Sequence, residues 1–438
     1  MNSLLQLPII NGAVPAALIA AGLLALLLLV WGNRRLLTRW APGALVLSIA
    51  ATVVFWYLAE KVWNLWGEPL PRRLYVYAGL ALFAVLMIVP KLVTLRRLWT
   101  RLLVAPVAAV VLVSAAGLAN QNFEYYPTLG SLFTATGTTV KTLGQFEADY
   151  GKMALPARTG PTTEATWRAP SNMPDHGEIL FVHIPGTISH LATVNGYVYL
   201  PPAYLATPKA NVPVLVLIHG VPGGTGDWLR GGRIATFMDQ YAAAHKGLAP
   251  VVVMPDAGDS GAYYPSACLN SRAGQAATYL TRDVPNWIKK TFGAGTYSPR
   301  QWAIGGFSYG GTCAMTLAVN HPEAYPTFID SSGESEPTIS QGRAYLIKKY
   351  FAGNAAAFAK QDALNVLKTR RYKGVAGVVT VGAGDTFYRP QGIEVFRAMK
   401  HARMDVRLQE APGGHAWPAW RYGVYHNMDW LMVRLGVG

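Results

Sequence analysis

Charged side chains are scarce in this chain. Asp, Glu, Lys and Arg make up 14% of its 438 residues and hydrophobic residues make up 51%, whereas roughly 25% of an ordinary soluble domain is charged. Disordered chains and proteins that coat nucleic acid need a high charged fraction and a low hydrophobic fraction, so the composition argues against both classes. The formal net charge is +15, but residues 1–120 alone carry ten basic and two acidic residues, between apolar runs where membrane topology accounts for them. We therefore expect no nucleic-acid partner.

Four long segments lack charged residues and histidine altogether: residues 7–31, 42–59, 74–90 and 102–119. About 20 helical residues cross the hydrocarbon core of a bilayer, and ~17 is a working minimum. Helices of soluble proteins rarely stay apolar on every face for so long, so the sequence predicts a membrane anchor of four transmembrane helices in residues 1–120. A cleaved signal peptide is the alternative for the first run, which lacks the positively charged start of such peptides.

The loops between these runs differ in charge. The loops after the first and third runs carry only basic charges: Arg34, Arg35 and Arg39 in one, Lys91, Arg96, Arg97 and Arg101 in the other. The loop after the second run also contains Glu60 and Glu68. Because loops rich in Lys and Arg stay in the cytoplasm, we expect a bacterial-type cell membrane with everything after residue 120 outside. The runs hold no ionisable side chain, which favours an anchor over a transport pathway.

Cysteine is also rare, with Cys268 and Cys313 only. A domain outside the cytoplasm can keep a disulfide, and two cysteines allow one pairing. Two separate buried thiols are the alternative, since Cys313 lies in an apolar helical stretch. The chain has no H-E-x-x-H motif, its cysteines are not clustered and its histidines are scattered, so no metal site and no cofactor are predicted.

Residues 121–175 are predicted to be a connector, with an extended linker at 156–174, and residues 176–438 a catalytic domain. Short β-rich runs occur at 179–184, 193–200, 212–218, 250–254, 301–304, 327–329, 377–381 and 406–410. Helical segments are expected at 274–292, 309–320, 342–367 and 393–401. Two leading strands followed by alternating strands and helices indicate an α/β fold, a mostly parallel sheet with an antiparallel start. Such sheets place their chemistry at the carboxyl ends of the strands.

A G-x-S-x-G motif, Gly306-Phe307-Ser308-Tyr309-Gly310, stands directly after one of these strands and before an Ala-rich helix. This strand–turn–helix context is what the nucleophile elbow of α/β-hydrolases requires, because the turn is too tight for Cβ atoms beside the serine. The amino end of the helix also favours developing negative charge. The motif predicts Ser308 as a nucleophile.

A nucleophilic serine needs a general base, and the base needs an acid that orients it. In α/β-hydrolases the acid and then the histidine follow the serine along the chain. Asp385 comes just after the strand at 377–381, and His415 comes just after the strand at 406–410. We predict Asp385 as the acid and His415 as the base. Asp330 and Glu334, which follow the preceding strand, are the alternatives for the acid.

The oxyanion of the tetrahedral intermediate needs backbone donors. One should be the N–H of Tyr309, directly after the nucleophile. The other should come from the turn His219-Gly220-Val221-Pro222 after the strand at 212–218, and because Pro222 has no N–H we predict Val221. The candidates for the substrate pocket lie in this turn, in the loop after it and beside the histidine: His219, Asp227, Trp228 and Trp417.

With these residues in place, residues 178–438 resemble the Putative esterase family of α/β-hydrolases, which includes esterase D and the antigen 85 mycolyltransferases. Further segments that carry the resemblance are YVYLPP at 197–202, YLTRDVP at 279–285, HPE at 321–323 and GHAWPAW at 414–420. The resemblance implies Ser308 as nucleophile, His415 as base, an acidic partner, and donors at Val221 and Tyr309. Mycolyltransferases hold trehalose with an acidic loop, whereas residues 223–228 contain a single acid, Asp227.

The sequence therefore predicts a membrane-anchored, extracytoplasmic serine ester hydrolase. Its expected substrates are lipidic or cell-envelope esters, such as aminoacyl-phospholipids or acylated glycolipids, so membrane lipids would serve as both anchor and substrate. Acyl transfer by the same triad is one alternative, and a non-catalytic receptor or assembly domain is another. Residues 342–373 carry eight basic residues and one acid, Asp362. They either contact anionic headgroups or form an ordinary solvated helical connection.

Overall fold

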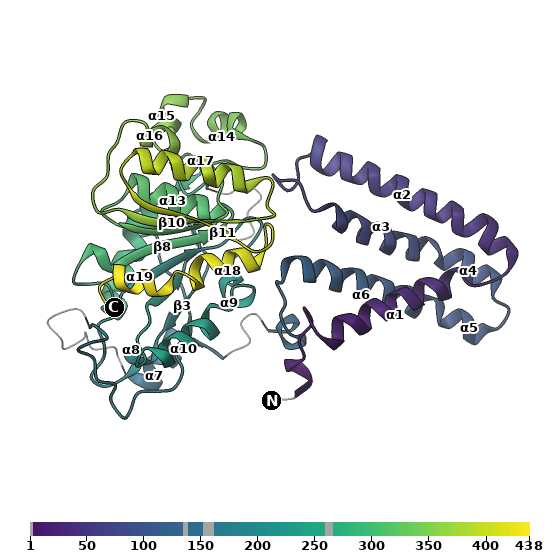
Figure 1. The fold of residues 1–438 in the computed structure, drawn as a ribbon, viewed down its shortest axis with the longest axis horizontal. Helices are drawn as coiled ribbons and strands as arrows, with labels where there is room; N and C mark the ends of the chain where they lie inside the picture. Colours follow the sequence, from purple (N-terminus) through teal and green to yellow (C-terminus); the bar gives the residue numbers. More distant parts are fainter. Residues whose placement is uncertain (1–2, 135–138, 152–161, 259–265) are drawn as a thin grey trace. The chain divides into compact units, whose positions relative to one another are not determined.

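The structure is a computed structural model that describes residues 3–134, 139–151, 162–258 and 266–438. It divides into two compact units, residues 1–133 and residues 134–438. The boundary between Phe133 and Thr134 falls inside the segment that the sequence assigns to a connector. The two units are built on different principles, an all-helical one and an α/β one (Figure 1).

The first unit contains four helices that are long and apolar enough to cross a membrane: Ala13–Val30, Leu36–Val62, Arg72–Thr94 and Leu98–Phe123. They comprise α1 (Ala13–Val30), η2 (Leu36–Trp40), α2 (Ala41–Tyr57), η3 (Leu58–Val62), α3 (Arg72–Leu86), α4 (Ile88–Thr94), α5 (Leu98–Leu102) and α6 (Val104–Phe123), with short turns η1 (Ser3–Gln6) and η4 (Leu129–Leu132) outside them. The second and fourth helices are much longer than the apolar runs at 42–59 and 102–119. Charged residues at helix ends still form helical hydrogen bonds, so a helix extends beyond its apolar run.

Small side chains let the helices of the first unit approach closely. Gly22 of α1 faces Ser114 of α6, whose hydroxyl donates to the carbonyl oxygens of Leu18 and Val110 at 2.7 and 2.8 Å. Polar groups at the helix ends are paired within the unit. Lys91 donates to the carbonyl oxygens of Leu28 and Trp31 at the end of α1, and Glu60 accepts from Trp56, Tyr75 and the N–H of Leu70. These polar groups are thus paired inside the unit, while many of its large apolar side chains are exposed.

The second unit is built on a nine-stranded sheet in the order β1-β2-β3-β5-β4-β8-β9-β10-β11. The strands are β1 (Val140–Thr142), β2 (Glu178–Val182), β3 (Gly196–Leu200), β4 (Val214–Ile218), β5 (Val251–Met254), β8 (Trp302–Phe307), β9 (Thr327–Ser331), β10 (Ala376–Gly382) and β11 (Asp405–Ala411). Strand β3 runs antiparallel to β2 and β5, and every other pairing is parallel. The predicted α/β class, with an antiparallel start, is confirmed. Strands β4, β5, β8 and β10 are fully buried and rich in β-branched or small residues, as parallel central strands require.

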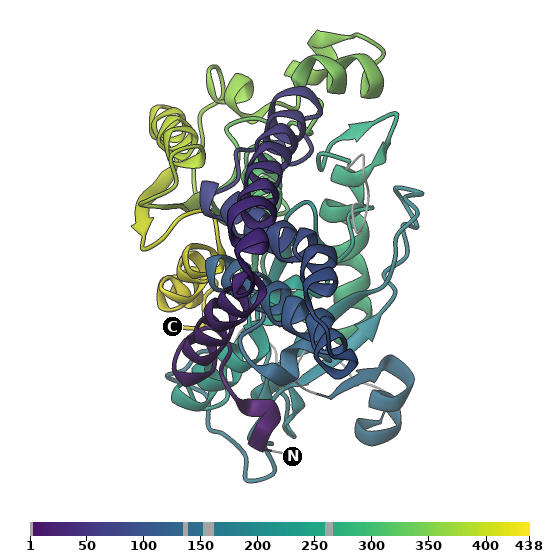
Figure 2. The ribbon, with the colours of Figure 1, turned by 90° about the vertical axis from the view of Figure 1, so that its right-hand side faces the viewer.

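Helices cover both faces of this sheet (Figure 1). They are α8 (Pro202–Leu205), α9 (Asp227–Arg230), α10 (Ile234–Ala244), α11 (Ala276–Thr278), η5 (Tyr279–Asp283), α12 (Val284–Phe292), η6 (Pro299–Gln301), α13 (Tyr309–Asn320), α14 (Arg343–Tyr350), α15 (Ala355–Ala359), α16 (Ala363–Leu367), α17 (Tyr388–His401), α18 (Trp417–Tyr425) and α19 (Met428–Arg434); α7 (Leu143–Tyr150) and a hairpin of β6 (Asn270–Ser271) and β7 (Gly274–Gln275) complete the unit. Neighbouring residues of β9 mark the two faces: Asp330 lies against Gly311 of α13, and Ser331 lies against Gly423 of α18. In the turned view of Figure 2, α17–α19 lie on the left of the unit and α14–α16 at its top.

The helical segment expected at 342–367 is wrong as a single element, because the structure breaks it into α14, α15 and α16. Ala352 and Gly353 adopt positive φ angles of 54° and 81°, which ends α14. Asn354 and Asp362 then cap the next two helices by accepting N–H bonds from Ala357 and Leu364. Capping residues inside the segment therefore outweigh its overall helix propensity.

The connector contributes to the second unit. Strand β1 pairs in parallel with β2, and α7 follows it with a capping box between Thr142 and Gln145. Of the linker expected at 156–174, the first part to residue 161 lies outside the described residues. In the rest, Trp167 is fully buried and its indole N–H donates to the Lys246 carbonyl oxygen at 2.9 Å. This part of the segment is therefore anchored on the α/β unit.

Candidate active site

Ser308 stands at the carboxyl end of β8 and immediately before α13. Its φ of 53° and ψ of −127° are a strained backbone conformation for a residue with a Cβ atom. The turn has no room for a side chain two residues before or two residues after Ser308: a Cβ at Gly306 would overlap the backbone of Gly310, and one at Gly310 would overlap the carbonyl oxygen of Ile218. The glycines of the motif are thus explained by close backbone packing, and the strain holds the serine hydroxyl outside the helix.

His415 bridges the serine and an acid. The Ser308 hydroxyl lies 2.9 Å from His415 Nε2, and His415 Nδ1 lies 3.1 Å from Asp385 Oδ2. These distances fit the tautomer that a general base needs, in which Ser308 donates to Nε2 and Nδ1–H donates to the carboxylate. The structure therefore brings together the three residues that the sequence singled out.

Asp385 is held as a carboxylate by its own turn. Its Oδ1 accepts from the backbone N–H groups of Phe387 and Tyr388 at 3.1 and 2.9 Å, which leaves Oδ2 for His415. Burial by itself raises the pKa of Asp385, but the hydrogen bond and charge of His415, with the two N–H groups, outweigh it and keep the pKa below its ordinary value. The acid is thus ionised at neutral pH and fixed in direction.

The alternative acids lie elsewhere. Asp330 is completely buried behind the elbow, where its Oδ1 accepts from the Gly333 N–H at 2.8 Å. Its Oδ2 has no hydrogen-bond partner among the described residues, and burial raises the pKa of Asp330 to about 7. Glu334 is joined to α13 through its backbone, whose N–H donates to the Thr312 hydroxyl at 2.7 Å. Asp385 is the carboxylate that contacts the Nδ1 of the histidine.

Two aromatic residues that the sequence analysis did not single out hold the histidine. The Tyr388 ring stacks on the His415 ring, with centroids 3.9 Å apart and planes 10° apart. The Trp420 ring meets it edge-on at 5.0 Å. Tyr388 lies three residues after Asp385 and Trp420 lies in the helix after His415, but no local sequence signal shows that either ring reaches the imidazole. Together they restrict the rotation of the imidazole.

The predicted oxyanion donors come from adjacent turns. Tyr309 is the first residue of α13, where backbone N–H groups have no partner within the helix. The turn after β4 lies directly against this helix, because a Cβ at Gly310 would meet the carbonyl oxygens of both Ile218 and His219. Val221 follows in that turn and is half-buried. The two turns therefore carry Val221 and Tyr309 on the same edge of the sheet as Ser308.

The four candidates for the substrate pocket are buried and support the site from within. His219 is 1% exposed, with Nδ1 at 2.7 Å from the Gly220 carbonyl oxygen. Asp227 closes its loop by accepting from the Gly224 N–H at 2.9 Å. Trp228 and Trp417 are fully buried and meet edge-to-face at 5.6 Å. The indole N–H of Trp228 also donates to the Ile218 carbonyl oxygen at 3.0 Å. The four side chains are thus packed in the protein interior, and that they line a substrate pocket stays a prediction.

Cys268 and Cys313 form a disulfide, with Cα atoms 5.5 Å apart. It joins the segment after β5 to α13, the helix that begins directly after Ser308. The hydroxyl of Tyr309 lies 3.8 Å from the sulfur of Cys268. The covalent link thus fixes this segment to the first turns of the helix that carries the nucleophile elbow.

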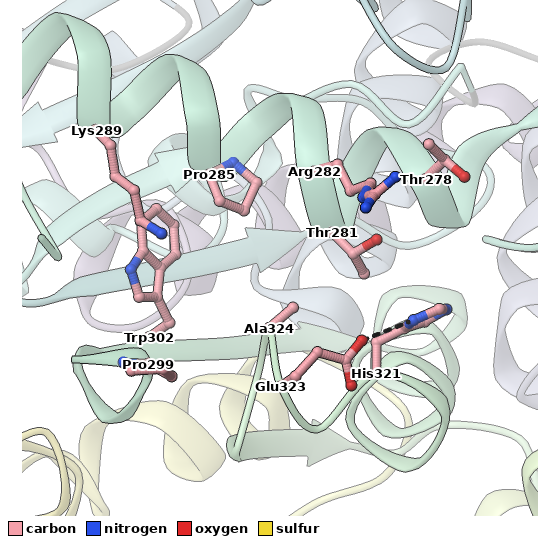
Figure 3. A pocket seen from close by; sticks show the side chains of 10 residues that line it. All are labelled: Thr278, Thr281, Arg282, Pro285, Lys289, Pro299, Trp302, His321, Glu323 and Ala324. Atoms are coloured by element: carbon pink, nitrogen blue, oxygen red, sulfur yellow. Dashed lines mark hydrogen bonds and ion pairs between the residues drawn. The ribbon is translucent and has the colours of Figure 1, made fainter.

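A pocket of about 460 Å³ lies away from the triad (Figure 3). Its lining includes Arg282, Lys289 and the ion pair of His321 with Glu323. Trp302, which also lines it, is the first residue of β8, whereas Ser308 follows the last one. A strand of this length spans about 20 Å, so the pocket lies at the amino end of the sheet, opposite the catalytic residues. Within the part of the chain that the structure describes, no group of His, Cys, Asp and Glu is placed to hold a metal ion.

The fold and the triad together define an α/β-hydrolase unit with the geometry of a serine hydrolase. A model of the Putative esterase family matches residues 192–426, more than half of the chain. The chain belongs to this family. The match covers the turn after β4 that contains Val221, and also Ser308, Asp385 and His415, but not the four helices of the first unit.

Two proteins similar in sequence and one similar in structure extend this comparison. An uncharacterized protein of Corynebacterium glutamicum is 33% identical over 411 residues, which cover 91% of each chain. An acetyl esterase of Caldicellulosiruptor saccharolyticus is 24% identical over 50% of this chain and 84% of its own length. The solved structure of a ferulic acid esterase matches with a TM-score of 0.50 and 18% identity, over 59% of this chain and 99% of that chain. The Corynebacterium protein is thus similar over most of both units, and the two esterases over part of the chain.

Proposed function

We propose that this protein is a membrane-anchored serine ester hydrolase whose catalytic unit lies outside the cytoplasm and acts on lipidic or cell-envelope esters. The observation that carries the catalytic part is the contact chain Ser308 Oγ to His415 Nε2 at 2.9 Å and His415 Nδ1 to Asp385 Oδ2 at 3.1 Å. Membership of an esterase family supports the same chemistry.

Acylation follows from this geometry. His415 Nε2 takes the hydroxyl proton as Ser308 Oγ attacks the ester carbonyl carbon, and Asp385 stabilises the resulting imidazolium. The N–H groups of Val221 and Tyr309 would stabilise the oxyanion, at ~3–4 kcal/mol per donor. Collapse of the intermediate breaks the bond to the alcohol oxygen, which leaves with the proton from His415. An acyl group remains on Ser308.

Deacylation repeats these steps with water. His415 removes a proton from a water molecule, the hydroxide attacks the acyl carbonyl, and the proton returns to Ser308 as the carboxylic acid leaves. Transfer to a sugar or lipid alcohol would use the same acyl-enzyme with a different nucleophile. Product analysis with and without an added alcohol acceptor separates the two outcomes.

Two observations support an extracytoplasmic catalytic unit. The loops after the first and third helices carry only basic residues, which favours the cytoplasmic side for them. The second unit contains the Cys268–Cys313 disulfide, a bond that persists mainly outside the reducing cytoplasm. A protease-sensitive tag at the C-terminus should therefore be cleaved by external protease in intact cells. A protected tag would mean that the topology is inverted.

The substrate class is proposed from the tether. Four helices long enough to cross a membrane would keep the catalytic unit close to bilayer esters at high effective concentration. Aminoacyl-phospholipids and acylated glycolipids carry esters near the headgroup, where such a unit would meet them. We expect extracted envelope lipids to yield a released acid or amino acid only when the protein is active.

The test of the hydrolase is labelling by a fluorophosphonate probe, which reacts covalently with activated serines. We expect the full-length protein in detergent to be labelled and Ser308→Ala to lose labelling completely. Ser298→Ala, just before the amino end of the same strand, is the matched control and should label like the wild type. Unlabelled, folded wild-type protein in both detergent and lipid would contradict the proposal.

A further inference from the structure

The positive charge of the C-terminal region is concentrated in one segment. Residues 121–438 contain 28 basic and 21 acidic residues. Residues 343–373, here called the basic insert, contain eight of the basic residues and one of the acidic ones, so the rest of the region holds 20 of each sign and is neutral. The eight are Arg343, Lys348, Lys349, Lys360, Lys368, Arg370, Arg371 and Lys373. The insert thus accounts for the whole net charge of the region outside the four helices.

The basic insert presents this charge on its outer side. All eight basic residues are exposed. The one acid, Asp362, is 4% exposed and caps α16 from inside, 3.7 Å from Arg343. The apolar side chains of the insert face inward, where Leu346, Tyr350 and Phe358 form a core with Leu269. Every exposed charged side chain of the insert is therefore basic.

Local partners account for only part of this charge. Arg343 pairs with Glu336, Arg370 donates to the carbonyl oxygens of Val319 and Asn320, and Arg371 contacts His401. The five lysines are different. Among the described residues, none of them has a carboxylate oxygen within 4.0 Å.

Helix ends give a simpler explanation for some of the lysines. Lys348 and Lys349 lie in the last turn of α14, and Lys360 and Lys368 are the C-caps of α15 and α16. A cation there interacts favourably with the helix dipole. The helix dipole explains lysines at helix ends, but it does not explain why the other exposed positions of the insert hold no acid. Those positions contain only Ala, Gly, Asn and Thr. Ordinary surfaces mix both signs, as the rest of the region does.

We propose that the basic insert docks on the anionic phospholipid surface of the bilayer that holds the four helices. This inference rests on the proposed membrane placement of the first unit and is independent of the hydrolase chemistry. A tethered unit meets the bilayer continuously, so weak attractions add up. Lysines suit this partner, because a flexible ammonium group forms loose contacts with many headgroups, whereas tight recognition of one phosphate favours arginine. The insert begins after β9 and packs beside Cys268, so docking would fix how the catalytic edge meets the membrane.

Lysine footprinting of the full-length protein tests the proposal. The protein is placed in nanodiscs of phosphatidylcholine alone or with about one third phosphatidylglycerol, and an amine-reactive reagent followed by mass spectrometry gives the labelling rate of each lysine. We expect the rates of Lys348, Lys349 and Lys360 to fall at least about threefold in the anionic discs and to recover at high salt. Lys289 and Lys290, also exposed in the last turn of a helix, should label equally in both.

Matched variants sharpen the footprint. Lys348→Gln with Lys349→Gln should weaken the protection of Lys360, whereas Lys289→Gln with Lys290→Gln should leave it unchanged. Equal labelling of the insert in both lipids would overturn the proposal. Protection by soluble polyphosphate in neutral discs, without protection in anionic discs, would also overturn it and identify a soluble polyanion as the partner. Fluorophosphonate labelling of Ser308 in the same samples reports the hydrolase separately, so lysine protection without serine labelling would support docking while contradicting the proposed enzyme.

Discussion

The two units use apolar side chains in opposite ways. Of the 44 large hydrophobic residues that are exposed within the described ranges, 37 lie in the first unit and seven in the second, although the second is more than twice as long. Only 22% or less of the most apolar window of each long helix is buried. The fully buried strands of the second unit place the same residue types inside.

This difference indicates that the two units fold in different solvents. A surface of Leu, Ile, Val and Trp is compatible with hydrocarbon, where helices satisfy their own backbone groups. In water the same side chains must be covered by a sheet and its helices, and polar groups can then be held at fixed positions in the protein interior. Chemistry is therefore expected in the second unit, and the following changes test that division.

The largest expected effect is on the triad carboxylate. Asp385→Asn should lower the rate of ester hydrolysis by about 10⁴-fold, because an amide favours the wrong tautomer of His415 and does not stabilise the imidazolium. Initial rates with a short-chain ester measure it. Glu60→Gln, which changes a carboxylate with comparable N–H and O–H donors in the first unit, should leave the rate unchanged. Near-normal activity of Asp385→Asn would return the acid role to Asp330 or Glu334.

The disulfide is a covalent link that the first unit lacks. Replacing Cys268 and Cys313 by serine opens a link across 45 residues and should destabilise the second unit by about 2–4 kcal/mol. Thermal unfolding in detergent measures the loss, and reduction of the wild type should reproduce it. An unchanged unfolding temperature after confirmed reduction would show that the bond does not support the fold.

The third test places an arginine at one exposed apolar position in each unit. Ile49 of α2 is 54% exposed and Val433 of α19 is 63% exposed. Ile49→Arg should reduce membrane insertion, at a cost of about 3 kcal/mol near the centre of a span, whereas Val433→Arg should change stability by no more than about 0.5 kcal/mol. Protein yield in the membrane fraction is the measurement. Equal tolerance at the two sites would argue against a hydrocarbon environment for α2.

The last test concerns the buried acid behind the elbow, whose effect is small at any one pH and appears as a pH dependence. Because the pKa of Asp330 is raised from 3.8 to about 7 in the folded state, the unfolded chain loses the proton first, and stability falls as the pH rises from about 4 to 7. Asp330→Asn removes this dependence, so its advantage over the wild type should grow across that range, by on the order of 1 kcal/mol for each pH unit. Unfolding temperatures at several pH values measure it, and parallel curves for the two proteins would contradict the assignment.

Much of the site was readable from the chain because its residues are fixed by local rules. Gly306 and Gly310 indicate a turn without room for Cβ atoms at those positions. The order of serine, acid and histidine along the chain follows the order of the parallel strands. Local patterns do not decide which of Asp385, Asp330 and Glu334 is the acid that contacts the histidine. Asp330 lies near the carboxyl end of β9 and Asp385 follows β10, so both are at the same edge of the sheet. The tertiary structure separates them: Asp385 contacts His415, whereas Asp330 packs against Gly311 of α13.

The pocket candidates illustrate what local patterns leave open. His219, Asp227, Trp228 and Trp417 are all buried, and sequence position does not state which side of a loop faces the core. Tyr388 and Trp420 were passed over for the same reason, since stacking on His415 depends on how two helices follow two strands.

The sequence by itself determined the four apolar helices, the α/β succession and the candidates for nucleophile and base, because each depends on local periodicity, local charge or a turn that excludes side chains. The tertiary structure decided which carboxylate meets His415, that Cys268 reaches Cys313, and that the insert at 343–373 turns every cation outward. These outcomes depend on distances between segments far apart in the chain, which packing sets and local patterns do not encode.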